Sequence, residues 1–194
     1  MYEDIAARWT WISRFTSTGF ALTLAEGRSP EALLLSFGVD PGEADMLTLA
    51  GAGEEFGAEY PVIRAGDLDD WGFAFEEFGQ KGGDETAILA LSEGTKVASV
   101  FRGGDGTSVF TYAENGQLVC AFDPLMASWR RGVDPDRFAD TMRAVGIDPG
   151  GSTRSGTDPI VAALTLVTVE LGVQIDYASI EGPLLSGEAA PSSD

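Results

Sequence analysis

The pattern of apolar and polar positions is clearest in residues 95–123, TKVASVFRGGDGTSVFTYAENGQLVCAFD. Three apolar-rich segments are separated there by two turns that contain glycine. The second turn is Asn115-Gly116, and both positions accept the positive φ that a type I′ hairpin turn requires. We therefore predict a three-stranded antiparallel meander at the centre of the fold.

The Asn115-Gly116 turn also predicts a pairing register, since hairpin turns fix which residues face each other. Tyr112 is expected opposite Val119, and Phe110 opposite Ala121, all on one face. The residues expected on the other face are Val109, Thr111, Leu118, Cys120 and Phe122. Both faces are at least half apolar, so helices are expected to cover most of one and part of the other.

Helices are predicted where apolar residues recur every three or four positions, in several cases behind a Ser-Pro or Asp-Pro start. The predicted helices cover 2–15, 30–37, 43–56 (weakly), 135–145 and 159–171, and residues 86–91 are predicted as a short helix or a loop with one helical turn. Ser29, Asp134 and Asp158 are the expected capping residues of three of them. Further strands are predicted at 20–24, 60–64 and 71–78, with an edge strand at 173–177.

These elements predict an α+β fold with one antiparallel sheet of about five or six strands, the meander at its centre and helices mainly on one face. A single domain is expected over 1–181. The segment 182–194 is small, polar and contains proline, and is expected to be disordered. Segments 29–42 and 134–150 share a Pro-started helix followed by Gly and Asp-Pro-Gly. Shared helix capping and an internal duplication both account for this similarity.

The net charge of −19 is concentrated in residues 40–93, where 14 acidic residues face only Arg64 and Lys81. Such a surface repels nucleic-acid phosphates, so no direct nucleic-acid binding is expected. It either attracts a basic partner or keeps the protein in solution. A single cysteine, an acidic start and the lack of an apolar run of about 20 residues favour a cytoplasmic protein without a membrane segment.

The chain contains no histidine. This excludes Ser-His and Cys-His nucleophile pairs, zinc sites that use histidine, and the usual general base near neutral pH. No catalytic residue, metal site or cofactor is predicted. A hydrolase or metal-dependent enzyme would have to use carboxylates, and the candidates are Asp67, Glu76 and Asp123.

Two groups of residues are candidates for binding a partner. The first is Asp67, Asp69, Asp70 and Trp71, in the sequence AGDLDDWG. Its carboxylates alternate as in a calcium loop, but the glycine and glutamate of an EF-hand are missing, so an exposed hairpin tip is expected. The second is the only basic and aromatic cluster, Trp129, Arg130 and Arg131. These arginines either bind an acidic partner group or pair with carboxylates of their own chain.

Five stretches resemble an uncharacterised family of actinobacterial cytoplasmic proteins, a domain of unknown function. They are FALTLAEGRSPEALLLSFGVD, WGFAFEEFG, LSEGTKVASVF, FTYAENGQLVCAFDP and GVDPDRFADTMRAVGI. The resemblance implies no activity or ligand, and no site residue is carried over from it. The expected architecture also resembles that of small bacterial immunity proteins, which is an analogy of fold alone.

The sequence thus favours a non-catalytic, immunity-like or regulatory interaction module that binds a basic protein through its acidic surface. A carboxylate- or metal-dependent hydrolase is the alternative. An acidic mimic of DNA that occupies a nucleic-acid-binding protein is a third interpretation. The oligomeric state is not predicted.

Overall fold

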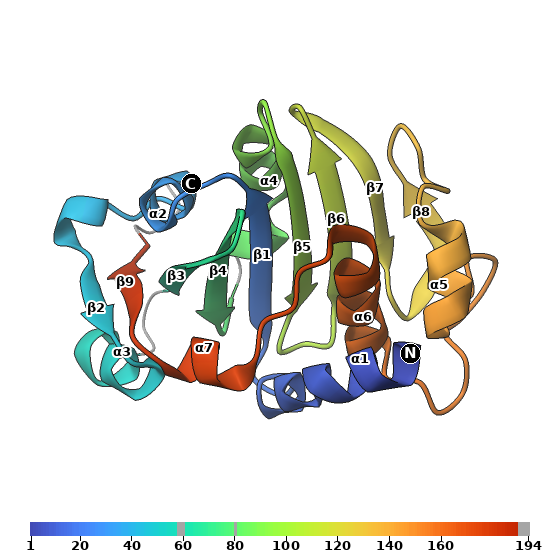
Figure 1. Cartoon of the computed structure of the whole chain (residues 1–194), viewed down its shortest axis with the longest axis horizontal. Helices are drawn as coiled ribbons and strands as arrows, with labels where there is room; N and C mark the ends of the chain where they lie inside the picture. The colour runs from blue at the N-terminus through green and yellow to red at the C-terminus, as the bar shows by residue number, and fades with distance from the viewer. Residues whose placement is uncertain (58–60, 80, 190–194) are drawn as a thin grey trace.

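The computed structural model describes residues 1–57, 61–79 and 81–189, which form a nine-stranded antiparallel sheet with helices on both faces (Figure 1). The strand order is β2-β9-β3-β4-β1-β5-β6-β7-β8. The strands are β1 (Phe20–Glu26), β2 (Asp45–Leu47), β3 (Val62–Leu68), β4 (Trp71–Glu77), β5 (Lys96–Arg102), β6 (Ser108–Glu114), β7 (Gln117–Asp123), β8 (Met126–Arg131) and β9 (Leu184–Glu188). The α+β class and the antiparallel sheet are confirmed, but the predicted five or six strands are too few.

Seven α-helices and three short 3₁₀ helices occur in the described ranges. They are α1 (Tyr2–Trp9), η1 (Thr10–Arg14), α2 (Pro30–Ser36), η2 (Pro41–Glu43), α3 (Leu49–Phe56), η3 (Lys81–Gly83), α4 (Glu85–Leu91), α5 (Ala139–Val145), α6 (Pro159–Leu171) and α7 (Tyr177–Glu181). Ser29 caps α2 and Asp158 caps α6, as predicted. Asp134 does not cap α5, because a turn intervenes and the helix begins only at Ala139. No helix in these ranges is long and apolar enough to cross a membrane.

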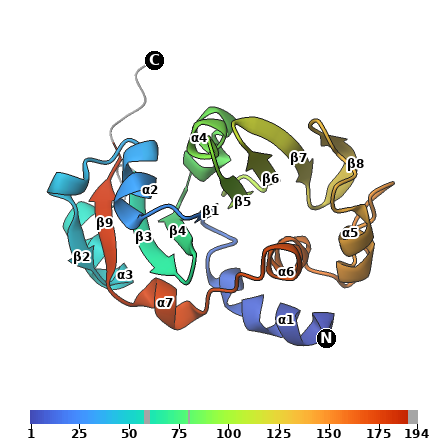
Figure 2. The same ribbon diagram turned by 45° about the horizontal axis from the view of Figure 1, so that its top comes forward.

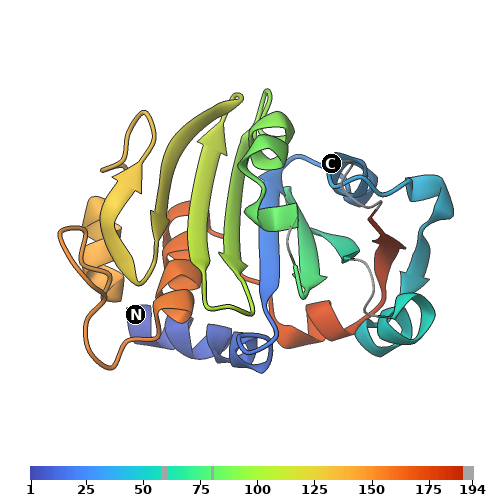
Figure 3. The ribbon, with the colours of Figure 1, turned by 180° about the vertical axis from the view of Figure 1, so that it is seen from behind.

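The helices divide the interior into two layers. Figure 2 shows α1, α5, α6 and α7 along one side of the sheet, and α2 and α4 along the other. From behind, α4 lies in front of the strands and α6 behind them (Figure 3). The larger buried cluster contains the aromatic side chains of α1, β1 and β4 together with most of α6. The smaller cluster lies under α2 and α4. Helices therefore cover both faces of the sheet, each set over its own buried cluster.

The predicted meander is present as β5, β6 and β7, but it lies toward one edge of the sheet and not at its centre, and its predicted register holds only beside the turn. Asn115 and Gly116 have φ values of 50° and 76°, as a type I′ turn requires. A bulge at Val119 then shifts the pairing by one residue, so that Tyr112 faces Cys120 and Phe110 faces Phe122. Because side chains alternate between faces, this shift puts Cys120 and Phe122 on the same face as the two aromatic residues, and corrects the predicted faces.

The predicted disorder of 182–194 is wrong for the part that the structure describes. β9 lies inside the sheet, antiparallel to both β2 and β3. The guanidinium of Arg64 is buried beside it and donates hydrogen bonds to the carbonyls of Leu47, Ile180 and Gly182. Pairing on both sides satisfies the backbone of β9, so a segment of small and polar residues becomes ordered without a strong apolar pattern. Residues 190–194 lie outside the described residues.

Two further predicted elements differ. The weak helix expected over 43–56 is divided into η2, the edge strand β2 and a short α3 that begins after the cap Thr48. The edge strand expected at 173–177 is an irregular connection that leads into α7. Distant residues determine the conformation in both places: β2 pairs with β9, and the Trp11 indole donates a hydrogen bond to the Ile175 carbonyl.

Candidate functional site

The first candidate group lies together on one surface feature, here called the acidic turn: Asp67, Asp69, Asp70 and Trp71. Asp69 and Asp70 form the two-residue connection between β3 and β4, and Leu68 pairs with Trp71. The backbone of Asp69 adopts a φ of 52°, a left-handed conformation that aspartate tolerates better than most residues. All four residues line an open groove of about 530 Å³.

The other wall of this groove comes from the end of β1, which the sequence did not assign to the site. Glu26 pairs with Trp71, and the Gly27 amide donates a 2.7 Å hydrogen bond to the Asp70 carbonyl. A Cβ added at Gly72 would lie 2.1 Å from the Arg28 carbonyl oxygen, so glycine is required for the loop to approach so closely. Long-range pairing of β1 with β4 thus adds a fourth carboxylate.

The charges in the groove are unevenly neutralised. Glu26 forms a 3.3 Å ion pair with Lys96, and the Arg28 guanidinium donates to the carbonyls of Leu91 and Glu93. Asp67, Asp69 and Asp70 are exposed, and none of them takes part in an ion pair within the described ranges. Their negative charge is therefore open to solvent.

The acidic turn also borders a second hollow of about 330 Å³, which extends to the segment that follows α6. Asp69, Asp70 and Trp71 line both hollows, together with Gly172, Val173 and Gln174 on the second side. The turn is therefore a ridge with a concave surface on each side. Such a ridge offers a partner both carboxylates and the partly buried ring of Trp71.

The second candidate group lies elsewhere on the molecule. Trp129, Arg130 and Arg131 belong to β8, and strands β1, β5, β6 and β7 separate β8 from β4. Arg130 pairs with Asp136, and Arg131 with Glu85. Both arginines therefore pair with carboxylates of their own chain, which was one of the two expectations. The two groups do not form one site.

The three carboxylates named for a hydrolase do not come together. Glu76 lies four residues beyond Gly72, the partner of Asp67, which separates the two acids by about 13 Å along the strand. Asp123 accepts a 2.8 Å hydrogen bond from the Leu125 amide in the β7–β8 turn. In the described ranges, no group of three or more acidic or cysteine side chains lies close enough to hold a metal ion.

Among the carboxyl groups that the structure describes, Glu76 has the most strongly shifted pKa, although it is far from both candidate groups. Only 2% of it is exposed, on the face of β4 that η3 covers. One oxygen, Oε2, accepts a 2.8 Å hydrogen bond from the Gly82 amide, whereas Oε1 has no hydrogen-bond partner. Burial raises the pKa of Glu76 to about 7.

The cover over Glu76 fits closely because it contains glycine. A Cβ at Gly79 would lie 2.7 Å from the Glu76 carboxylate, and one at Gly82 would lie 2.5 Å from the Ala21 Cβ. The Ser99 hydroxyl contacts the Thr23 hydroxyl at 3.1 Å and donates to the Gly82 carbonyl at 2.7 Å. From the sequence, Glu76 was named only as one of three carboxylates that a hydrolase could use.

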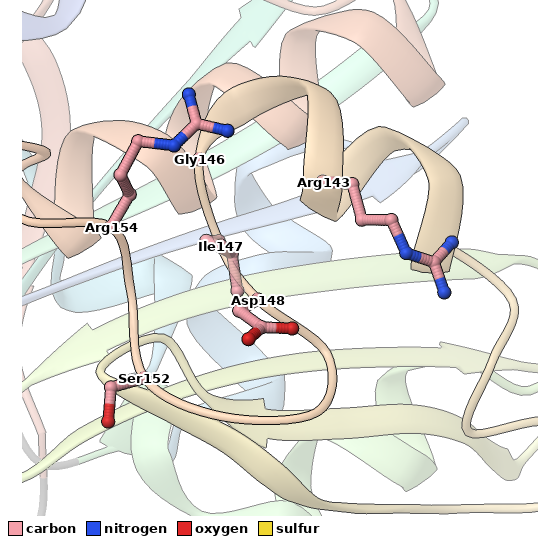
Figure 4. Close-up of a pocket in the computed structure, with 6 residues that line it drawn as sticks. All are labelled: Arg143, Gly146, Ile147, Asp148, Ser152 and Arg154. Atoms are coloured by element: carbon pink, nitrogen blue, oxygen red, sulfur yellow. The ribbon is translucent and has the colours of Figure 1, made fainter.

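A further hollow of about 410 Å³ lies where α5 ends (Figure 4). Figure 4 shows the side chains of Arg143 and Arg154 on either side of Asp148. Asp148 accepts a hydrogen bond from the Gly150 amide, and Arg143 pairs with Asp140. Asp140 and Asp148 offset the charges of Arg143 and Arg154, so this hollow favours neither an anionic nor a cationic ligand.

Fold and surface together define a mixed α/β protein on a nine-stranded antiparallel sheet, with an acidic ridge at one β-hairpin turn. A family model, described as a family of unknown function (DUF6461), matches residues 4–176, and the chain belongs to this family. The match ends before α7 and β9. No curated protein and no solved structure matches the chain.

Proposed function

We propose that the protein is a non-catalytic interaction module, immunity-like or regulatory, that binds a basic partner in the cytoplasm through the acidic turn. One observation carries the proposal: Asp67, Asp69, Asp70 and Trp71 line one open groove, and the three aspartates make no ion pair in the described ranges. Their charges remain available to lysine or arginine side chains of a partner.

The charge of the surrounding chain supports the same surface. Residues 40–93 carry 14 acidic and 2 basic residues, a net charge of −12. A field of one sign steers an oppositely charged partner and raises the association rate, mainly at low ionic strength. The hollows on both sides of the ridge also favour partners of a matching shape, whereas a flat acidic surface would attract any cation equally.

Trp71 supplies the apolar contact that charge alone lacks. Its ring is partly buried and lines both hollows. A lysine or arginine held over an indole ring gains about 0.5–1 kcal/mol at an exposed site. We therefore expect the partner to place a basic side chain against Trp71 while neighbouring basic groups pair with the aspartates.

The test compares two variants that lose the same charge. Asp67→Asn/Asp69→Asn/Asp70→Asn removes three carboxylates from the acidic turn, and Glu3→Gln/Glu54→Gln/Glu55→Gln removes three exposed ones elsewhere. Binding of an oligolysine peptide is measured by calorimetry at low and at physiological salt. Three exposed pairs contribute about 2 kcal/mol together, so only the first variant should bind about 30-fold more weakly.

Equal weakening of both variants would mean that net charge alone attracts the peptide, and the proposal would fail. Capture of a partner from cell extract gives a second measurement: reversal of the three aspartates to lysine should abolish it, and unchanged capture contradicts the proposal. A captured nucleic-acid-binding protein that salt releases would favour the narrower function of a DNA mimic.

A further inference from the structure

The edge strand β8 contains an irregular bulge, within which a tryptophan side chain is exposed. Ala121 of β7 pairs with Arg131, and Asp123 pairs with Met126. Four residues of β8 therefore lie opposite the single residue Phe122 of β7. Within the bulge Ala127 is fully buried, whereas Trp129 is 78% exposed. Bulges redirect side chains in this way at sheet edges.

Hydrogen bonds and an ion pair fix the backbone of the bulge, so the exposure of Trp129 does not result from a flexible segment. The Arg130 guanidinium donates to the carbonyls of Ala127 and Pro149 and to the Asp136 carboxylate. Arg131 forms an ion pair with Glu85. At Gly132, a Cβ would lie 2.3 Å from the Val119 carbonyl oxygen, which fixes the end of the strand against β7.

Trp129 is one of four exposed apolar residues within 125–133, here called the apolar patch: Leu125, Met126, Trp129 and Val133. Their exposed fractions are 53%, 49%, 78% and 70%. The whole described chain exposes only eight large apolar side chains to this degree, and four of them lie within these nine residues. A cluster of this kind marks an interaction surface more often than scattered exposed residues do.

Charge distribution separates this end of the molecule from the rest. Residues 124–157 contain five arginines and four aspartates, a net charge of +1, so the remaining residues carry −20. Figure 1 shows β8, α5 and their connecting loops gathered at one end of the sheet. The acidic turn lies between β3 and β4, on the far side of β1, β5, β6 and β7.

We propose that two copies of the chain associate through their apolar patches. A second copy fits this surface because the patch is apolar and nearly neutral, and therefore complementary to itself about a two-fold axis. A basic partner would instead be drawn to the acidic turn. In this arrangement the acidic turn of each copy lies on the far side of its sheet from the contact.

The interface is small, and its strength follows from its size. A tryptophan buries roughly 150–250 Å², and three partly exposed aliphatic side chains add a similar area. The resulting area of about 300–500 Å² per partner is smaller than the roughly 800 Å² of a standard interface and is typical of a weak, transient contact. We expect a dimer with a dissociation constant in the micromolar range, in which Trp129 is the central anchor.

Sedimentation velocity of the full chain tests this proposal. The 20.4 kDa monomer should give way to a species of twice that mass between about 1 and 500 μM. Raising the salt should tighten the dimer, because salt screens the repulsion between two acidic chains. The opposite salt dependence is expected for a basic partner at the acidic turn, so the two proposals fail separately.

Trp129→Ser should weaken association at least tenfold, and Leu35→Ser is the matched control, since Leu35 is 64% exposed on α2, outside the patch. Because Trp129 is exposed, both variants should keep the melting temperature of the wild type within a few degrees. A wild-type chain that stays monomeric at 500 μM in high salt overturns the proposal, and so does a dimer that Trp129→Ser leaves unchanged.

Discussion

The buried carboxyl of Glu76 makes the stability of the protein depend on pH in a direction that can be predicted. Its pKa is raised from 4.5 to about 7, with burial as the main cause and the Gly82 and Lys81 amides and the Lys81 charge opposing it. The folded chain therefore keeps a proton on Glu76 between pH 4.5 and 7, whereas the unfolded chain releases it. Folded protein binds more protons in this window, so the free energy of unfolding falls as the pH rises through it.

The size of the effect follows from the same two values. A gap of about 2.5 pKa units corresponds to about 3 kcal/mol, which is present in full below pH 4.5 and lost above pH 7. Glu76 is almost completely buried, so solvent screening gives little reason to reduce this figure. Glutamine has the same shape without the charge, and its side-chain carbonyl can still accept the hydrogen bond from the Gly82 amide.

Glu76→Gln should consequently be about 3 kcal/mol more stable than the wild type at pH 8 and nearly equal to it below pH 5. Urea unfolding at both pH values measures the difference, and taking wild type minus variant cancels the titration of the other acids. Glu55→Gln, which changes an exposed carboxylate of α3, is the control and should show no such difference. A Glu76→Gln variant that is less stable than the wild type at pH 8 would refute the reasoning.

Two further predictions concern the sheet. Burial raises the pKa of the Cys120 thiol to about 12, so at pH 8 its thiolate should be about 1,000-fold scarcer than in an unperturbed cysteine, and a disulfide reagent should label it rapidly only after urea is added. Ser186→Pro places proline in β9, which is paired on both sides, and should lower the free energy of unfolding by about 3 kcal/mol or more, whereas Ser186→Ala keeps the backbone amide and should cost much less. A proline variant as stable as the alanine variant would contradict the position of β9.

Features set by neighbouring residues could be predicted from the sequence. Asn115-Gly116 specified its turn, and the caps Ser29 and Asp158 marked the starts of α2 and α6. Each of these depends on the conformational preference of a few residues or on a hydrogen bond within one helical turn. The bulge at Val119 was missed because it depends on how β7 fits between its neighbours.

Features set by distant residues could not be predicted in this way. β9 carries almost no strand signal, and it is ordered because β2 and β3 supply hydrogen-bond partners on both sides. The candidate site follows the same division. Asp67, Asp69, Asp70 and Trp71 were found together because they are close in sequence, whereas Glu26 joins them only through the pairing of β1 with β4.

The position of β9 between β2 and β3 also has a consequence for the order in which the chain folds during synthesis. β3 can pair with β4 as soon as both have emerged, but its other edge stays open until residues near 185 have been added. β2 pairs only with β9 and cannot join the sheet before then. A nascent chain thus exposes a free strand edge for most of its synthesis, at about 5–20 residues per second. We expect chaperones to contact the growing chain mainly during this interval, and we expect the arrival of β9 to end it.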